Sequence, residues 1–244
     1  MGPFKRLREK KYDGPVWVPI ENLRNWFIYV AAYLVRPIMK LVFRYKTIGR
    51  ENIPRAGEFG EQPVVFACNH VSFADPVILW SVLFAYGNGC RFLARSSLFR
   101  PVIGGLIARA GAIPIDPDTA DRKALKRAAS ALKRGENLLI FPEGTRMNRP
   151  DKVYHPHAGV VLIANMGKAK IVPVGISGTE RIMPYGKPKF LRFPRIYCNF
   201  GEPIDPKDPA FAELPKKERS MAVANAVMDR CFELRDEARD KARS

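Results

Sequence analysis

Cysteine and histidine are scarce in this 244-residue sequence, which holds four cysteines and three histidines. The cysteines are widely spaced and form no C-x-x-C pair, so the sequence indicates neither a zinc ribbon nor a disulfide framework. Around His155 and His157, no thiol or carboxylate beyond Asp151 lies at a spacing typical of metal ligands. We therefore expect no metal, no cofactor and a reducing, cytoplasmic environment.

Long uncharged apolar runs are also missing. The longest one within residues 22–44, Asn25 to Val35, is well short of the ~20 residues that a membrane-spanning helix needs. Its tryptophan and tyrosine residues, with arginine and lysine beside them, are typical of a helix or helix pair in a membrane interface, kinked or divided at Pro37. A core-packed amphipathic helix whose basic residues face water is the alternative. Because no apolar segment with a cleavage site follows the basic start of the chain, we expect no cleaved secretory signal.

Acidic residues are few relative to basic ones, since 24 Asp and Glu stand against 41 Lys and Arg, which gives a net charge of +17. Residues 1–50 hold eleven of the basic residues and three of the acidic ones. This charge favours an anionic partner, whether nucleic acid, anionic lipid or a phosphorylated substrate, without choosing among them. From the length and this asymmetry, we expect a basic N-terminal segment, 1–47, with the interface helix, and one folded unit, 48–244.

After Gly49, short apolar runs alternate with helical patterns, which predicts an α/β fold with a largely parallel central sheet flanked by helices. The expected strands are Val64–Cys68, Cys90–Ala94, Ala112–Ile115, Asn137–Phe141 and Ile171–Ile176. The expected helices are Pro76–Tyr86, Phe99–Arg109, Ala120–Arg134 and Gly159–Gly167. Prolines and glycines from Pro184 to Pro209 indicate strands and loops at a sheet edge. Apolar residues from Met221 to Leu234 recur at helical spacing and predict a docked C-terminal helix.

The first group of residues suited to chemistry directly follows an expected strand. The segment from Asn69 to Pro76 reads NHVSFADP, so the Asp75 carboxylate follows the His70 imidazole by five residues at a strand-to-helix transition. Sites of α/β sheets usually lie at such carboxyl ends of strands. An Asp that accepts from one ring nitrogen fixes the tautomer and leaves the other nitrogen to act as a general base. Alternatively, Asp75 caps the helix and His70 is a turn residue.

A second group, Phe141 to Arg146, reads FPEGTR and also follows an apolar strand. Gly144 lets the backbone approach a ligand closely, Thr145 offers a hydroxyl, and Arg146 offers a planar guanidinium suited to phosphate. Glu143 is expected either to orient that arginine or to bind a substrate hydroxyl. A solvated turn after the strand is the alternative.

Together, the two groups closely resemble the motifs of the glycerolipid acyltransferase family, which contains the bacterial 1-acylglycerol-3-phosphate acyltransferases. The N-H-x-x-x-x-D motif of the family is matched by Asn69, His70 and Asp75, and its F-P-E-G-T-R motif at every position from Phe141 to Arg146. The resemblance covers roughly residues 48–204. It implies catalytic roles for His70 and Asp75. The residues that it assigns to substrate binding are Glu143, Gly144, Thr145 and Arg146.

The sequence departs from the family pattern in a middle motif, G-x-I-x-I-D-R, which reads GAIPIDP here. Pro117 stands where the family commonly has an arginine thought to hold the acceptor phosphate. Arg95, at the end of a strand, and Arg122, at the start of a helix, are candidate replacements for phosphate binding, and each is otherwise a solvated surface charge. His155 and His157 are further candidate substrate contacts, because relatives often have a basic residue before a glycine in this region.

The resemblance implies an O-acyltransferase that moves a fatty acyl group from acyl-CoA or acyl carrier protein to the free hydroxyl of 1-acylglycerol 3-phosphate. The product would be phosphatidic acid, in phospholipid biosynthesis. His70 would take the hydroxyl proton as that oxygen attacks the thioester, without an acyl-enzyme. Cys68 is a weaker candidate for catalysis because it lies in an expected buried strand. The expected partners are a lysophospholipid acceptor and an anionic membrane surface, with the protein peripheral or monotopic on the cytoplasmic face of the cell membrane.

Two alternatives remain open. The same chemistry can serve another acceptor, such as glycerol 3-phosphate, another lysophospholipid or a glycolipid, and the altered Pro117 favours this. A non-catalytic basic protein that binds membranes or nucleic acid is supported mainly by the net charge. Because the sequence carries no recognisable nucleic-acid-binding motif, no nucleic acid partner is expected.

Overall fold

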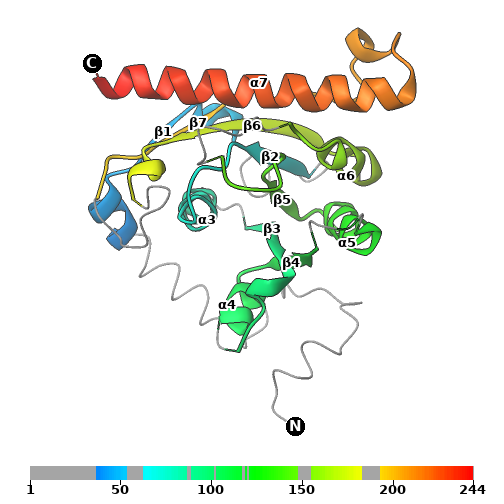
Figure 1. Cartoon of the computed structure of the whole chain (residues 1–244). Helices are drawn as coiled ribbons and strands as arrows, with labels where there is room; N and C mark the ends of the chain where they lie inside the picture. Colours follow the sequence, from blue (N-terminus) through cyan, green and yellow to red (C-terminus); the bar gives the residue numbers. More distant parts are fainter. Residues whose placement is uncertain are drawn as a thin grey trace.

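The computed structural model describes residues 37–53, 63–86, 89–101, 103–116, 119, 121–147, 155–182 and 193–243. They form a seven-stranded sheet with helices on both faces (Figure 1). The expected interface segment before residue 37 and the altered Pro117 lie outside these residues. In the described part of the chain, no helix is both long and apolar enough to cross a membrane.

The sheet is parallel except at one pair of strands. The strands are β1 (Lys46–Ile48), β2 (Val64–Cys68), β3 (Cys90–Arg95), β4 (Ala112–Ile115), β5 (Asn137–Ile140), β6 (Lys170–Ser177) and β7 (Tyr197–Phe200). Their order across the sheet is β1-β7-β6-β2-β5-β3-β4, with β6 and β7 antiparallel. The helices are α3 (Asp75–Ala85), α4 (Ile103–Arg109), α5 (Arg122–Lys133), α6 (Gly159–Gly167) and α7 (Lys216–Arg243), and residues 37–43 are also helical. Short 3-10 turns are η2 (Arg50–Asn52), η3 (Ser96–Leu98), η4 (Thr179–Arg181) and η5 (Pro209–Phe211).

Side chains of β2 alternate between two buried faces of the sheet. Phe66 and Cys68 belong to a core covered by α3 and by the helix at 37–43. Val65 and Ala67 belong to a second core, where α5, α6 and α7 pack. Because both faces are covered, all five residues of β2 are apolar and buried. The predicted α/β fold, with its largely parallel sheet flanked by helices, is confirmed.

Two elements differ from expectation. The helix α4 begins at Ile103 rather than Phe99, because Arg100 precedes Pro101 and the residue before a proline disfavours the helical conformation. Sequence analysis does not predict β1, which is three residues long, spans the expected division at residue 47 and pairs with β7. The strand β7 is of the kind expected for the stretch up to Pro209.

The strand β3 shapes the site because it changes partners along its length. It pairs with β5 over Cys90–Phe92 and with β4 over Phe92–Arg95. Beyond Phe92, β3 and β4 therefore leave the rest of the sheet, while β5 ends at Ile140 and the chain turns into the FPEGTR segment. The carboxyl ends of β3, β4 and β5 consequently border a cavity.

Candidate active site

Asp75, the first residue of α3, holds the imidazole of His70. The distance from His70 Nδ1 to Asp75 Oδ2 is 2.9 Å, and the same oxygen accepts the backbone N–H groups of Val71 and Ser72, each at 2.7 Å. Asp75 is completely buried, whereas His70 lines the cavity. Since Nδ1 bonds to a carboxylate, the neutral ring carries its proton there and leaves Nε2 as the proton acceptor. This is the arrangement that a general base requires.

The loop between β2 and α3 is tied to its surroundings on both sides of His70. The Asn69 side chain pairs with the backbone of Ile176 in β6, donating to its carbonyl at 3.1 Å and accepting its N–H at 2.8 Å. The His70 ring stacks on Phe141, with 4.2 Å between the ring centroids. The residue that caps α3 is Ala74, so the Asp75 carboxylate serves the loop rather than the helix end.

Hydrogen bonds to the backbone of His70 join the two motif loops. His70 N–H donates to Glu143 Oε1 at 3.0 Å, and Met147 N–H donates to the His70 carbonyl at 2.6 Å. Between these two contacts, Gly144 adopts a φ of 64°, and a Cβ there would lie 3.0 Å from the His157 ring. The turn thus requires glycine both for its left-handed conformation and for the close approach of His157.

Glu143 lies inside the protein, although the neighbouring residues of its motif line the cavity. Its side chain is 4% exposed and, among the described residues, its Oε2 has no hydrogen-bond partner. Burial raises the pKa of Glu143 to about 8, against the lowering effect of its hydrogen bonds with its own N–H and that of His70. Asp75 raises this pKa further, and Arg235 of α7 lowers it. The carboxyl group is therefore mostly protonated at neutral pH.

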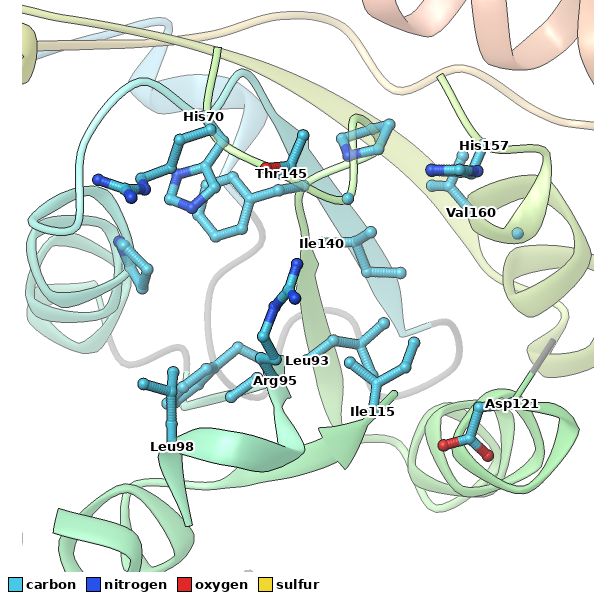
Figure 2. A pocket seen from close by; sticks show the side chains of 18 of the residues that line it. His70, Leu93, Arg95, Leu98, Ile115, Asp121, Ile140, Thr145, His157 and Val160 are labelled. Carbon is cyan, nitrogen blue, oxygen red and sulfur yellow. The ribbon is translucent and has the colours of Figure 1, made fainter. Parts of the chain in front are cut away.

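A cavity of about 960 Å³ lies beside His70 and is lined mainly by apolar side chains. Figure 2 shows His70 and Thr145 at one end and His157 at one side, with Leu93 and Ile115 along the wall. The wall residues come from several elements, such as Leu93 from β3 and Ile115 from β4, and each looks like an ordinary core position in the sequence. Sequence analysis therefore misses the apolar lining, because these residues are distinguished by their exposure to the cavity and not by their residue type.

The structure brings some of the expected cationic residues to this cavity and leaves others outside. Arg95 extends from β3 toward Thr145 and His70 (Figure 2). Arg146 also lines the cavity, with its guanidinium carbon 3.4 Å from the centroid of the Phe73 ring. Of the other two histidines, His157 lines the cavity and His155 is exposed outside it. Arg122 is likewise exposed, at the first residue of α5, and does not belong to the lining.

The thiol of Cys68 is a poor candidate nucleophile in this setting. It is completely buried in the core beneath α3, and burial raises its pKa well above the ordinary value. A protonated thiol reacts slowly, because the thiolate is the nucleophile. Within the described ranges, no three His, Cys, Asp or Glu side chains are grouped so that they could hold a metal ion.

Comparison with known proteins places these features in a family context. The acyltransferase family model matches residues 44–177. A 1-acyl-sn-glycerol-3-phosphate acyltransferase of Bacillus subtilis is 31% identical over 207 residues, which cover 83% of this chain and 94% of that protein. A lyso-ornithine lipid O-acyltransferase of Pseudomonas aeruginosa is 30% identical over 187 residues, which cover 76% of this chain and 65% of that protein. The crystal structure of the 1-acyl-sn-glycerophosphate (LPA) acyltransferase PlsC from Thermotoga maritima shares the fold, with a TM-score of 0.60 and 24% identity over 86% of this chain and 85% of that chain.

Proposed function

This chain belongs to the acyltransferase family, and we propose that it transfers a fatty acyl group from an acyl thioester to the free hydroxyl of 1-acylglycerol 3-phosphate, forming phosphatidic acid. The observation that carries the proposal is the His70–Asp75 pair, with His70 at the wall of a large apolar cavity. A general base next to a space suited to an acyl chain is what this transfer needs.

In the proposed mechanism, the acceptor oxygen attacks the thioester carbonyl carbon while His70 Nε2 takes the hydroxyl proton. The C–S bond of the tetrahedral intermediate then breaks, and the imidazolium returns the proton to the leaving thiolate. Asp75 keeps the ring oriented and stabilises its positive charge through the 2.9 Å contact with Nδ1. No acyl-enzyme forms, and general-base assistance contributes about 10²–10⁴ in rate.

We assign the cavity to both parts of the lipid. The apolar walls contributed by β3, β4 and α6 suit a fatty acyl chain. At the polar end, Arg95, Arg146 and Thr145 offer donors for a phosphate, and the imidazole of His157 lies at the same cavity. Gly144, which has no side chain, lets the acceptor approach the backbone of the turn that carries Thr145 and Arg146. Glu143, in contrast, is buried and does not line the cavity.

The charge of α5 supports an anionic donor, either acyl-CoA or acyl carrier protein. Its twelve residues contain five Lys or Arg and no acidic residue, and Arg122, Lys123, Lys126 and Lys133 are exposed. Leu125, on the same helix, lines the cavity, so the exposed basic residues lie near the site. Such a surface attracts phosphate groups or acidic side chains from a distance.

We further propose that the protein works at a membrane surface, on the cytoplasmic face, and exposed apolar residues at the cavity support the contact with a membrane. Phe73, Val77, Leu98 and Leu106 all line the cavity and are between 44% and 56% exposed. Apolar side chains that rim an opening for a long-chain lipid are suited to contact with a bilayer. The net charge of +17 adds attraction to anionic headgroups.

A different acceptor is the second candidate. Pro117 replaces the arginine that the family commonly has for the acceptor phosphate, and one relative at 30% identity is named as acting on a lyso-ornithine lipid. In this version the base and the donor stay the same, whereas Arg95 and His157 contact a different headgroup.

The test is acyl transfer from palmitoyl-CoA or acyl carrier protein to lysophosphatidic acid, glycerol 3-phosphate and neutral or amino-acid lysolipids, with the products resolved by mass. We expect phosphatidic acid from the wild type and from the control His155→Ala, and a loss of about 10²–10⁴ in kcat for His70→Ala and Asp75→Asn. A His70-dependent product from another acceptor would favour the second candidate. No transfer from either donor to any acceptor, together with salt-sensitive DNA binding, would favour a non-catalytic basic protein.

A further inference from the structure

Glu143 stands apart from its motif because its carboxyl group points away from the cavity. Pro142, Gly144, Thr145 and Arg146 all line the cavity, whereas Glu143 is 4% exposed and accepts the backbone N–H of His70 at 3.0 Å. We propose that Glu143 is a positioning residue that acts through His70 and does not contact the acceptor. The kinetic consequences of this inference rest on the proposed acyl transfer, whereas its structural consequence, the hydrogen bond to the His70 N–H, does not.

The backbone of His70 is held at both of its polar groups by one loop. Glu143 accepts its N–H, and Met147, four residues later, donates to its carbonyl at 2.6 Å. The imidazole is held separately, by Asp75 at Nδ1 and by the stacked ring of Phe141. Three of these four contacts come from residues 141–147, and Glu143 provides the only side chain in this set that fixes the peptide group itself.

The surroundings of Glu143 favour its protonated, neutral carboxyl group over the charged carboxylate. Asp75 adds negative charge nearby, and the buried thiols of Cys68 and Cys231 are also close enough to interact with it. Arg235 of α7 is the opposing positive group. With its pKa raised to about 8 by burial, the acid can accept the His70 N–H through its carbonyl oxygen without an ionised form. Glutamine has the same shape and the same acceptor, so it is a matched replacement.

The experiment compares the wild type with Glu143→Gln and Glu143→Leu in steady-state kinetics near pH 7. Because glutamine keeps the acceptor, we expect Glu143→Gln to retain kcat within about threefold. Leucine removes the acceptor, so kcat should fall about 10–100-fold through misplacement of the base, with the acceptor KM within about twofold. A raised acceptor KM in both variants with kcat unchanged would show that Glu143 binds the acceptor, and would overturn the proposal.

Hydrogen exchange at the His70 amide gives a readout that needs no substrate. We expect exchange at this amide to be at least about tenfold faster in Glu143→Leu and close to wild type in Glu143→Gln, because only leucine leaves the N–H unpaired. Leu132→Ala, a buried change in α5 outside the cavity, controls for general loss of stability. Unchanged exchange in Glu143→Leu would overturn the proposal. Faster exchange in a protein that acylates no acceptor would keep the Glu143 contact and discard the proposed function.

Discussion

At the scale of single residues, burial gives Glu143 a proton equilibrium unlike that of an exposed carboxyl group. Its pKa is about 8 in the folded chain, against 4.5 for the free group. Below pH 4.5 the carboxyl group is protonated in both the folded and the unfolded chain, so its ionisation does not change the free energy of unfolding. As the pH rises, the unfolded chain loses this proton first, and the stability present at low pH is lost as the pH passes toward 8. The total effect is on the order of a few kcal/mol.

We therefore predict that Glu143→Gln removes one source of instability at high pH. The free energy of unfolding of the variant, relative to the wild type, should rise from about pH 5 to about pH 8 and then level off. Urea unfolding at a series of pH values measures both proteins, and ionisable groups elsewhere cancel in the difference. A difference that stays constant over this range would mean that Glu143 is not protonated in the folded protein.

The contact between His70 and Asp75 could be predicted from the sequence, because it depends on residue type and spacing. His70 and Asp75 are five residues apart at the end of a buried strand, and the structure brings their side chains to 2.9 Å. The orientation of Glu143 could not be predicted in the same way. Within a turn, one residue can face inward while its neighbours face the cavity, and no periodicity marks which one.

At the scale of elements, α7 lies close against β6 because of one glycine. A Cβ on Gly175 would lie 2.2 Å from the backbone nitrogen of Arg235 and 2.5 Å from the carbonyl carbon of Leu234. Figure 1 shows α7 running across the strands β6 and β7. Since α7 also carries buried residues from Val223 to Ala238, its close contact with β6 supports a large part of the second core.

Gly175→Ala should thus destabilise the protein by about 2 kcal/mol or more, because backbone rather than a flexible side chain must move. The matched control is Gly159→Ala at the start of α6, where the nearest atom to a new Cβ, Leu125 Cδ2, is at an ordinary 3.8 Å. Alanine favours helices over glycine, so this control should be neutral or more stable by up to about 1 kcal/mol. Thermal unfolding measures both variants, and equal melting temperatures would contradict the close contact at α7.

The strands of the sheet could be predicted because apolar runs bounded by turn residues mark strands buried on both faces. The short β1 could not, since Lys46–Ile48 has one basic and one polar residue and gains its place by pairing with β7, which lies about 150 residues later. The cavity could not be predicted either. It depends on β3 leaving β5 after Phe92, which is a property of the strand register and not of any local pattern.

At the scale of the whole molecule, the exposed apolar residues at the cavity and the net charge of +17 both support the proposed association with an anionic bilayer. Residues 1–36 carry seven Lys or Arg and three acidic residues. Each basic residue near an anionic surface contributes about 1 kcal/mol at low salt. The structure shows where this segment can be removed: Phe43 is 5% exposed, belongs to the first core and lies 6.1 Å from the Phe193 ring, so the helix at 37–43 should be kept.

Deletion of residues 1–36 should therefore weaken binding to anionic vesicles far more than it affects the chemistry. We expect vesicle cosedimentation to fall at least about tenfold at low salt, since several basic residues are lost together, with a weaker salt dependence than in the full chain. Acyl transfer to a dispersed short-chain acceptor should stay within about threefold, because His70, Asp75 and the described residues that line the cavity all lie beyond residue 36. Neutral vesicles provide the control, on which the two proteins should differ less. Unchanged binding to anionic vesicles would assign membrane association to the exposed apolar rim at Phe73, Val77, Leu98 and Leu106 instead.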